Sequence, residues 1–103
     1  MKNRIKDGYV RRMDHVVWKV IDGKGVLLNL EDGSYFDVDP VGLGIWELCN
    51  GRATLNEIMA STSQRFPANS ERVSKDVPNF VKDLKAHGLV EVTSAPAPAL
   101  TRS

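Results

Sequence analysis

The stretch DGSYFDVDPVGLGIWELCNG, residues 32–51, contains the change from strand to helix that decides the fold. Its run SYFDV alternates in the way that a strand covered on one face does. The run VGLGIWELC then spaces its apolar residues as a helix does. Between the two, Asp39 can cap a helix, and Pro40 suits the first helical position because no N–H is needed there. We therefore expect strands before residue 39 and helices after it.

Three strands joined by two tight turns are predicted before this change. They are the runs VVWKVI (16–21), GVLLNL (25–30) and SYFDV (34–38). Residues 22–25 are predicted to form the first turn and Asp32-Gly33 the second, since glycine tolerates the positive φ of a tight reversal. The strands then form an antiparallel meander with Leu27 and Asn29 on its wetter face. Its buried face is expected to carry Val26, Leu28, Leu30, Phe36 and Val38.

The first two helices are predicted from the signals at their ends. The first begins at Pro40 and ends at Asn50-Gly51, because this pair readily adopts the conformation that stops a helix. The second begins with TLNE (54–57), a capping box in which the threonine and glutamate side chains satisfy each other's backbone N–H groups. Pro67, which cannot continue a helix, closes it.

A third helix and a short strand complete the predicted fold. The helix runs from about Ser70 or Ser74 to His87, and Pro78 either kinks it or falls in the first turn of a helix that begins later. The strand is LVEV (89–92). The predicted class is α+β: a three-stranded antiparallel meander, then a three-helix bundle that resembles a winged helix-turn-helix, then a short C-terminal strand.

The two ends of the chain carry few apolar anchors. Residues 1–14 are predicted to be a basic arm and residues 93–103 a disordered Ala/Pro tail, which leaves 15–92 as the folded domain. The chain has 103 residues, 42% of them hydrophobic and 26% charged, and a formal net charge of +1. That charge is too small to indicate nucleic acid. A single cysteine and the lack of a long apolar run predict a cytoplasmic protein without a membrane partner.

No catalytic residue, cofactor or metal site is predicted. Cys49 lies on an apolar helix face with no histidine near it in sequence, so it is interpreted as a small buried hydrophobe. His15 and His87 are explained by solvation and by the helix dipole. Gly42 and Gly44 lack the spacing of a phosphate-binding loop and instead let the first helix approach the sheet. We therefore expect a protein that is not an enzyme.

The strand at residues 34–38 is short and forms an edge of the meander unless another segment covers it. Asp37 and Pro40 can simply guard such an edge against aggregation. The same edge can also accept an extended peptide as an added strand. The residues by themselves leave both interpretations open.

The pattern over residues 15–92 resembles the PqqD family, named for the small protein D of pyrroloquinoline quinone synthesis. The fold of this family is also called the recognition element of ribosomally made, modified peptides (RiPPs). The tyrosine in the third strand is closer to the broad PqqD-like group, including lasso-peptide leader-recognition proteins, than to the quinone-pathway member. Asp39 and Pro78 depart from the family pattern, which favours asparagine at the first of these positions. The resemblance is carried by Leu28, Leu30, Gly33, Tyr35, Val38, Gly42, Ile45-Trp46-Glu47-Leu48, Gly51, Thr54, Glu57-Ile58, Asp76-Val77, Phe80, Leu84 and Gly88-Leu89.

The resemblance implies a non-catalytic peptide chaperone that captures the leader of a precursor peptide. It would present that leader to a modifying enzyme, such as a radical SAM protein or a lasso-peptide maturation enzyme. The leader would lie antiparallel along the third strand, in a groove against the third helix. The implied peptide-binding residues are Ser34, Tyr35, Phe36, Asp37, Val38, Asp76, Val77, Phe80, Val81, Leu84 and Lys85.

A winged-helix DNA-binding protein is the alternative interpretation. It requires a basic recognition helix that contacts phosphates. In the third helix, however, the basic side chains are nearly balanced by acidic ones. A free edge strand can also pair with its twin, so either a monomer or an edge-paired dimer is expected.

Overall fold

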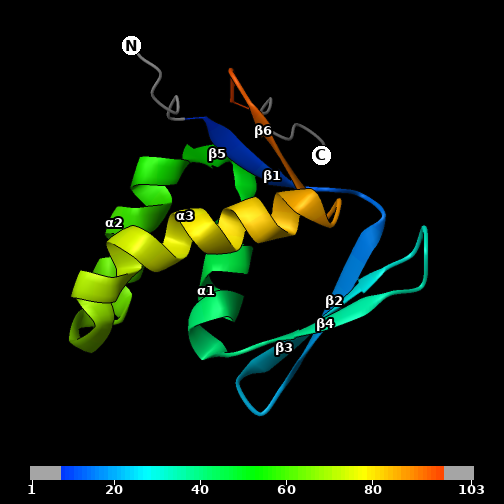
Figure 1. The fold of residues 1–103 in the computed structure, drawn as a ribbon, viewed down its shortest axis with the longest axis horizontal. Coiled ribbons are helices and arrows are strands. Elements are labelled where there is room, and N and C mark those ends of the chain that lie inside the picture. The colour runs from blue at the N-terminus through cyan, green and yellow to red at the C-terminus, as the bar shows by residue number, and fades with distance from the viewer. Residues whose placement is uncertain (1–7, 97–103) are drawn as a thin grey trace, which may run out of the picture.

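The computed structural model describes residues 8–96, and within them it confirms the α+β class (Figure 1). Half of the predicted basic arm and most of the predicted Ala/Pro tail lie outside the described residues. Two three-stranded antiparallel sheets flank a group of helices. The elements are, in order, β1 (Tyr9–Arg12), β2 (Val16–Ile21), β3 (Lys24–Asn29), β4 (Tyr35–Val38), α1 (Pro40–Leu48), β5 (Asn50–Thr54), α2 (Leu55–Arg65), the 3-10 helix η1 (Pro67–Asn69), α3 (Ser70–Ala86) and β6 (Val90–Thr93).

The predicted meander is the sheet with strand order β2-β3-β4. Asp22 and Gly23, with φ of 53° and 79°, make the first turn, and Ile21 pairs with Lys24 on either side of it. Two successive positive φ angles give the reversal whose twist matches that of the flanking strands. The second turn is longer than a two-residue hairpin, because residues 30–34 all lie outside the strands.

The predicted buried face of β3 is wrong, whereas that of β4 is right. Leu27 is fully buried, while Leu30 is 59% exposed. The register of the two strands sets odd-numbered residues of β3 opposite even-numbered residues of β4, and the reverse. Leu27 accordingly lies opposite Phe36. Residues directly opposite each other share a face, so the face of β4 that carries Phe36 joins Leu27 rather than Leu28.

The second sheet has the order β5-β1-β6 and joins three segments that are far apart in the sequence. Its central strand, Tyr9–Arg12, falls within the residues predicted to form the arm. This strand pairs with both neighbours, and Val10 is completely buried. The outer strand Asn50–Thr54 was not predicted either, since its sequence NGRAT has no strand-like alternation.

The helix ends follow the predicted capping chemistry. The Asp39 carboxylate accepts a hydrogen bond of 2.7 Å from the Gly42 N–H at the start of α1. At the start of α2, Thr54 and Glu57 form the full capping box. α3 runs without interruption from Ser70 to Ala86, with Pro78 inside it. Among residues 8–96, no helix is long and apolar enough to cross a membrane.

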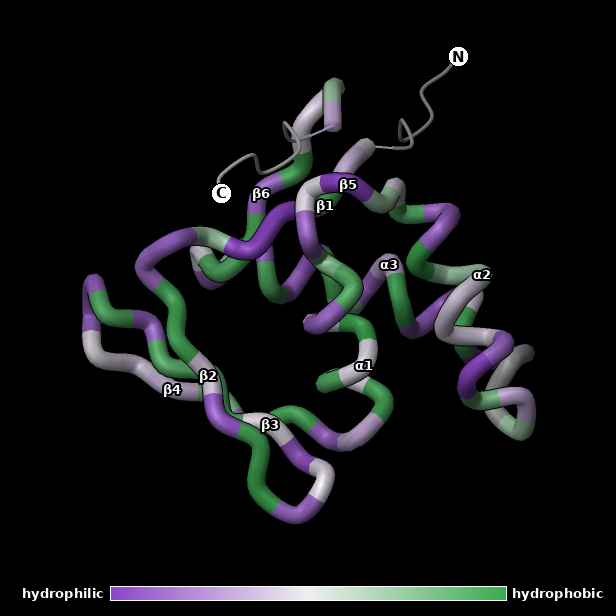
Figure 2. The backbone as a smooth tube through the Cα atoms, turned by 180° about the vertical axis from the view of Figure 1, so that it is seen from behind, coloured by the Kyte–Doolittle hydropathy of each residue, from purple (hydrophilic) through white to green (hydrophobic). Residues whose placement is uncertain are grey.

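The core lies where α1 and α3 meet the inner faces of the sheets. α1 contributes a continuous buried run, with Trp46 fully buried. α3 instead alternates between hydrophobic and hydrophilic residues, as the changing colours of its tube show in Figure 2. One face of α3 therefore enters the core. Its buried residues are Val73, Val77, Val81 and Leu84.

Candidate functional site

β4 is the free edge of its sheet, since its single partner among the described strands is β3. The N–H of Asn29 donates to the carbonyl of Ser34, which fixes the alternation of the ladder. Counted from Ser34, every second residue points its backbone N–H and C=O groups toward β3. The residues between them point these groups away from β3. The outward N–H and C=O groups therefore belong to Tyr35 and Asp37.

The side chains of β4 divide between two faces in the same alternation. Tyr35 is 69% exposed and Asp37 is also exposed, so both lie on the outer face. Phe36 is half-buried, and its ring lies 4.8 Å from the ring of His87 at the end of α3. Val38 is buried. The inner face thus points toward α3, and the outer face points toward solvent.

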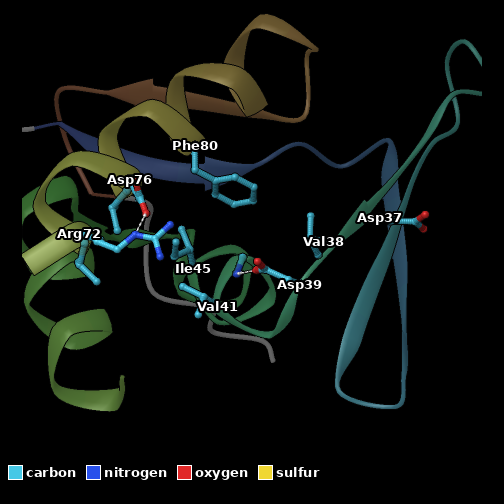
Figure 3. A pocket seen from close by; sticks show the side chains of 11 residues that line it. Asp37, Val38, Asp39, Val41, Ile45, Arg72, Asp76 and Phe80 are labelled. Carbon is cyan, nitrogen blue, oxygen red and sulfur yellow. Dashed lines mark hydrogen bonds and ion pairs between the residues drawn. The ribbon is translucent and has the colours of Figure 1, made fainter. Parts of the chain in front are cut away.

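A pocket of about 340 Å³ lies beside this edge, between β4, α1 and α3. In Figure 3 the Phe80 ring extends from α3 toward Val38, whereas the Asp37 carboxylate points away from both. Apolar side chains from all three elements form most of its wall. The lining residues are Asp37, Val38, Asp39, Val41, Gly42, Ile45, Arg72, Val73, Asp76, Val77 and Phe80.

Gly42 sets how closely α1 and α3 approach each other at the pocket. A Cβ atom at this position would lie 3.2 Å from the Phe80 ring and 3.2 Å from the Val38 Cβ. Both distances are tighter than ordinary carbon contacts, which are about 3.5–4.0 Å. The absence of a side chain at Gly42 therefore lets Phe80 and Val38 converge on one side of the pocket.

The charges around the pocket are mainly acidic. The lining residues include three acids, Asp37, Asp39 and Asp76, and a single cation, Arg72. Arg72 and Asp76 form an ion pair of 3.6 Å on the surface of α3. Their side chains are 75% and 57% exposed, so the pair is screened by solvent and contributes little to stability. Two carboxylates thus remain in excess over the guanidinium.

The structure brings together five of the residues predicted to bind a peptide. These are Asp37, Val38, Asp76, Val77 and Phe80, all of which line the pocket. Ser34, Tyr35 and Phe36 continue the same edge without lining the pocket.

The remaining predicted residues lie elsewhere on α3. Val81 and Leu84 are each only 4% exposed and belong to the core, and Lys85 is exposed. A charged substitution at Val81 would consequently destabilise the fold. Its effect on peptide binding could not then be attributed to a lost contact in a groove.

Sequence reasoning missed the part of the pocket that α1 and the first half of α3 supply. Val41 and Ile45 belong to the apolar stripe of α1, a pattern that equally indicates core. Arg72 lies on an exposed turn of α3, where a basic side chain is ordinary. Only the packing of α1 against α3 brings them beside β4.

Reactive groups do not gather at this site. Burial raises the pKa of the Cys49 thiol to about 12, and its S–H donates to the Ile45 carbonyl. A thiol in this environment is a poor nucleophile, because the thiolate is the reactive form. Within residues 8–96, no group of three or more histidine, cysteine or acidic side chains could hold a metal ion.

The described residues give no support to the DNA-binding alternative. A recognition helix needs surplus positive charge for phosphate contacts. The bases and acids of α3 nearly balance, and one of the bases, Arg72, is paired with Asp76. The charged residues of this helix are Arg72, Lys75, Lys82 and Lys85 against Glu71, Asp76 and Asp83.

Comparisons with known proteins agree with the geometry. A model of the family described as coenzyme PQQ synthesis protein D (PqqD) matches residues 24–90. Among solved structures, the chain is similar to TbiB1 in complex with the TbiA(beta) leader peptide, with 33% sequence identity and a TM-score of 0.68. That match covers 79% of this chain and 94% of the other. No curated protein matches this sequence.

Proposed function

Because the chain belongs to the family of coenzyme PQQ synthesis protein D, we propose that it binds the leader segment of a ribosomally made precursor peptide. The leader joins the sheet as a strand beside β4 and packs against the pocket between β4, α1 and α3. The observation that carries this proposal is the free edge of β4 directly beside a pocket with apolar walls and a charged rim. The similarity to TbiB1, which was solved with a leader peptide, supports the same ligand class.

Backbone pairing and pocket burial have separate roles in this binding. Tyr35 and Asp37 offer four outward backbone groups, and each hydrogen bond contributes a net of about 0.5–1.5 kcal/mol. Micromolar affinity corresponds to about −8 kcal/mol, and the ordering of a flexible peptide opposes binding. Pairing alone is therefore insufficient. Apolar leader side chains must also enter the pocket beside Val38 and Phe80.

The protein acts as a non-catalytic partner of a modifying enzyme in this proposal. Its role is to hold the leader in an extended form, so that the enzyme meets a pre-ordered substrate. Pre-ordering removes part of the conformational entropy that the enzyme would otherwise have to overcome. A radical SAM protein or a lasso-peptide maturation enzyme is the expected class of partner.

The experiment compares Asp37→Pro with Asp37→Ala. Proline removes the outward N–H and places a ring at the edge, whereas alanine removes only the carboxylate. Edge strands tolerate proline where the N–H faces solvent, and Phe36 already has the extended backbone that proline requires of its predecessor. The titrant is a synthetic leader peptide, beginning with the TbiA(beta) leader with which the similar structure was solved, and binding is followed by calorimetry.

We expect Asp37→Pro to weaken leader binding about ten-fold or more beyond the effect of Asp37→Ala, with thermal unfolding of both variants close to that of the parent. Equal affinities of the two variants would show that the backbone edge of β4 is not used.

A further inference from the structure

Asp37 is a carboxylate without an ion-pair partner among the described residues. It is exposed on the outer face of β4, and its neighbour across the ladder is Val26. Tyr35, the next residue of β4 on this face, lies opposite Leu28. Asp37 therefore has Val26 as its immediate neighbour on the outer face, with Lys19 one strand further away on β2, and it lies immediately beside the free edge.

The alternation of a strand determines what an added peptide presents to Asp37. A peptide residue that pairs directly with Asp37 shares its face and places its Cβ about 5.5 Å away or less. The peptide residues before and after that one lie on the inner face, beside the pocket and the buried Val38. One position of the peptide thus meets the Asp37 carboxylate, while both its neighbours lie on the inner face, where Val38 and Phe80 form the apolar part of the pocket wall.

The rest of the pocket favours the same sign of charge in the peptide. Asp39 and Asp76 lie on its rim with Arg72, which is already paired with Asp76. A basic peptide residue near this rim is attracted by the surplus of carboxylates, and an acidic one is repelled. The attraction decreases with added salt because these carboxylates are exposed.

We propose that the leader segment bound on β4 carries a lysine or arginine directly opposite Asp37, with an apolar residue on each side of it. This inference rests on the proposed function and names the residues that the site selects. The apolar neighbours fill the pocket, and the cation pairs with Asp37 on the outer face. The same cation can also lie against the ring of Tyr35, where a cation–π contact adds to the attraction.

A selection experiment tests this pattern without knowledge of the natural leader. The full chain is used to select binders from a displayed peptide library in which every position of an extended segment is randomised. We expect enrichment of Lys or Arg at one position with apolar residues on both sides, and loss of the basic preference when Asp37→Asn is the target. Asp83→Asn, an exposed acid of α3 that does not line the pocket, should leave the preference unchanged.

The outcomes separate this inference from the proposed function. Apolar peptides that bind at β4 without a basic preference would overturn the inference and leave leader binding intact. If none of the selected peptides loses affinity for the Asp37→Pro variant, none of them uses the backbone edge of β4. That result would overturn the proposed function itself. An unchanged basic preference with Asp37→Asn would also overturn the role of Asp37.

A charge swap on one selected peptide measures the pair directly. Asp37→Lys should weaken binding of that peptide about two- to five-fold or more, because the new lysine repels the basic residue of the peptide. Replacing the basic peptide residue by glutamate should restore binding to Asp37→Lys while weakening binding to the parent protein. If the swapped pair binds no better than either single change, the two residues do not meet.

Discussion

At the scale of single residues, the pocket depends on a position that has no side chain. Gly42 and Gly44 both lie in α1 and both are buried, but they approach different neighbours. Gly42 approaches Phe80 and Val38, which line the pocket, whereas Gly44 approaches Arg65 and Phe66, which do not. The two glycines therefore form a matched pair in which one approaches side chains of the pocket and the other does not.

Gly42→Ala is expected to weaken leader binding about ten-fold, because the new methyl group pushes Phe80 from its place in the pocket wall. Gly44→Ala gives the same gain in helix propensity, and its methyl group meets side chains outside the pocket. Calorimetric titration of both variants with the same leader checks this expectation. Equal affinities for Gly42→Ala and Gly44→Ala would contradict the role given to Gly42.

Cys49 gives the stability a pH dependence of known sign. The unfolded thiol loses its proton above about pH 9, whereas the buried thiol keeps its proton to about pH 12. The unfolded state is therefore favoured as the pH rises through this range. Between pH 7 and pH 10.5 the parent should lose about 2 kcal/mol of unfolding free energy that Cys49→Ala does not lose. Urea unfolding at both pH values measures the difference, and parallel losses would contradict it.

At the scale of elements, α3 continues through a proline that its interior does not favour. Pro78 has no N–H to give to the carbonyl of Ser74, one turn earlier. Val77, just before the proline, and Phe80, two residues after it, both line the pocket. The helix is therefore locally weakened at the level where it forms the pocket wall.

Pro78→Ala should stabilise the protein by about 1–3 kcal/mol, because it restores a helical hydrogen bond and removes a poor helix former. Thermal or urea unfolding of the variant beside the parent provides the measurement. A lower stability would mean that the packing of the half-buried proline ring outweighs its effect on the helix.

The elements that could be predicted from the sequence are those specified by local chemistry. Asp39, the capping box at Thr54 and the turn at Asp22-Gly23 each satisfy a nearby backbone group, so their own neighbours define them. β1 and β5 could not be predicted, because they become strands by pairing with segments distant in sequence. Only part of the candidate site could be predicted, for the same reason. The strand β4 is specified by its own sequence, whereas α1 contributes to the pocket only through its packing against α3.

At the scale of the whole molecule, β1 ties the two halves together. It is the centre of the second sheet, and Arg12 at its end donates to the carbonyls of Trp46 and Glu47 in α1. The Arg12 guanidinium also lies 4.9 Å from the Trp18 ring of β2. Arg12 thus contacts both the helical core and the sheet β2-β3-β4.

Deletion of residues 1–14 should abolish cooperative unfolding, because it removes the central strand and exposes the partners of the buried Val10. Deletion of residues 1–7 serves as the control, since it removes none of the described contacts. Circular dichroism during heating distinguishes the two proteins. Cooperative unfolding after the longer deletion would show that β5 and β6 hold their places without β1.

The pairing of β1 with β6 places Tyr9 opposite Thr93, so the first and last strands meet at one side of the molecule (Figure 1). The open edge of β4 belongs to the other sheet. A second polypeptide joined genetically ahead of Gly8 or behind Pro96 would consequently emerge away from the groove, and its tether would not compete with an incoming strand. Fusion of another protein at either terminus is therefore compatible with an unobstructed β4 edge.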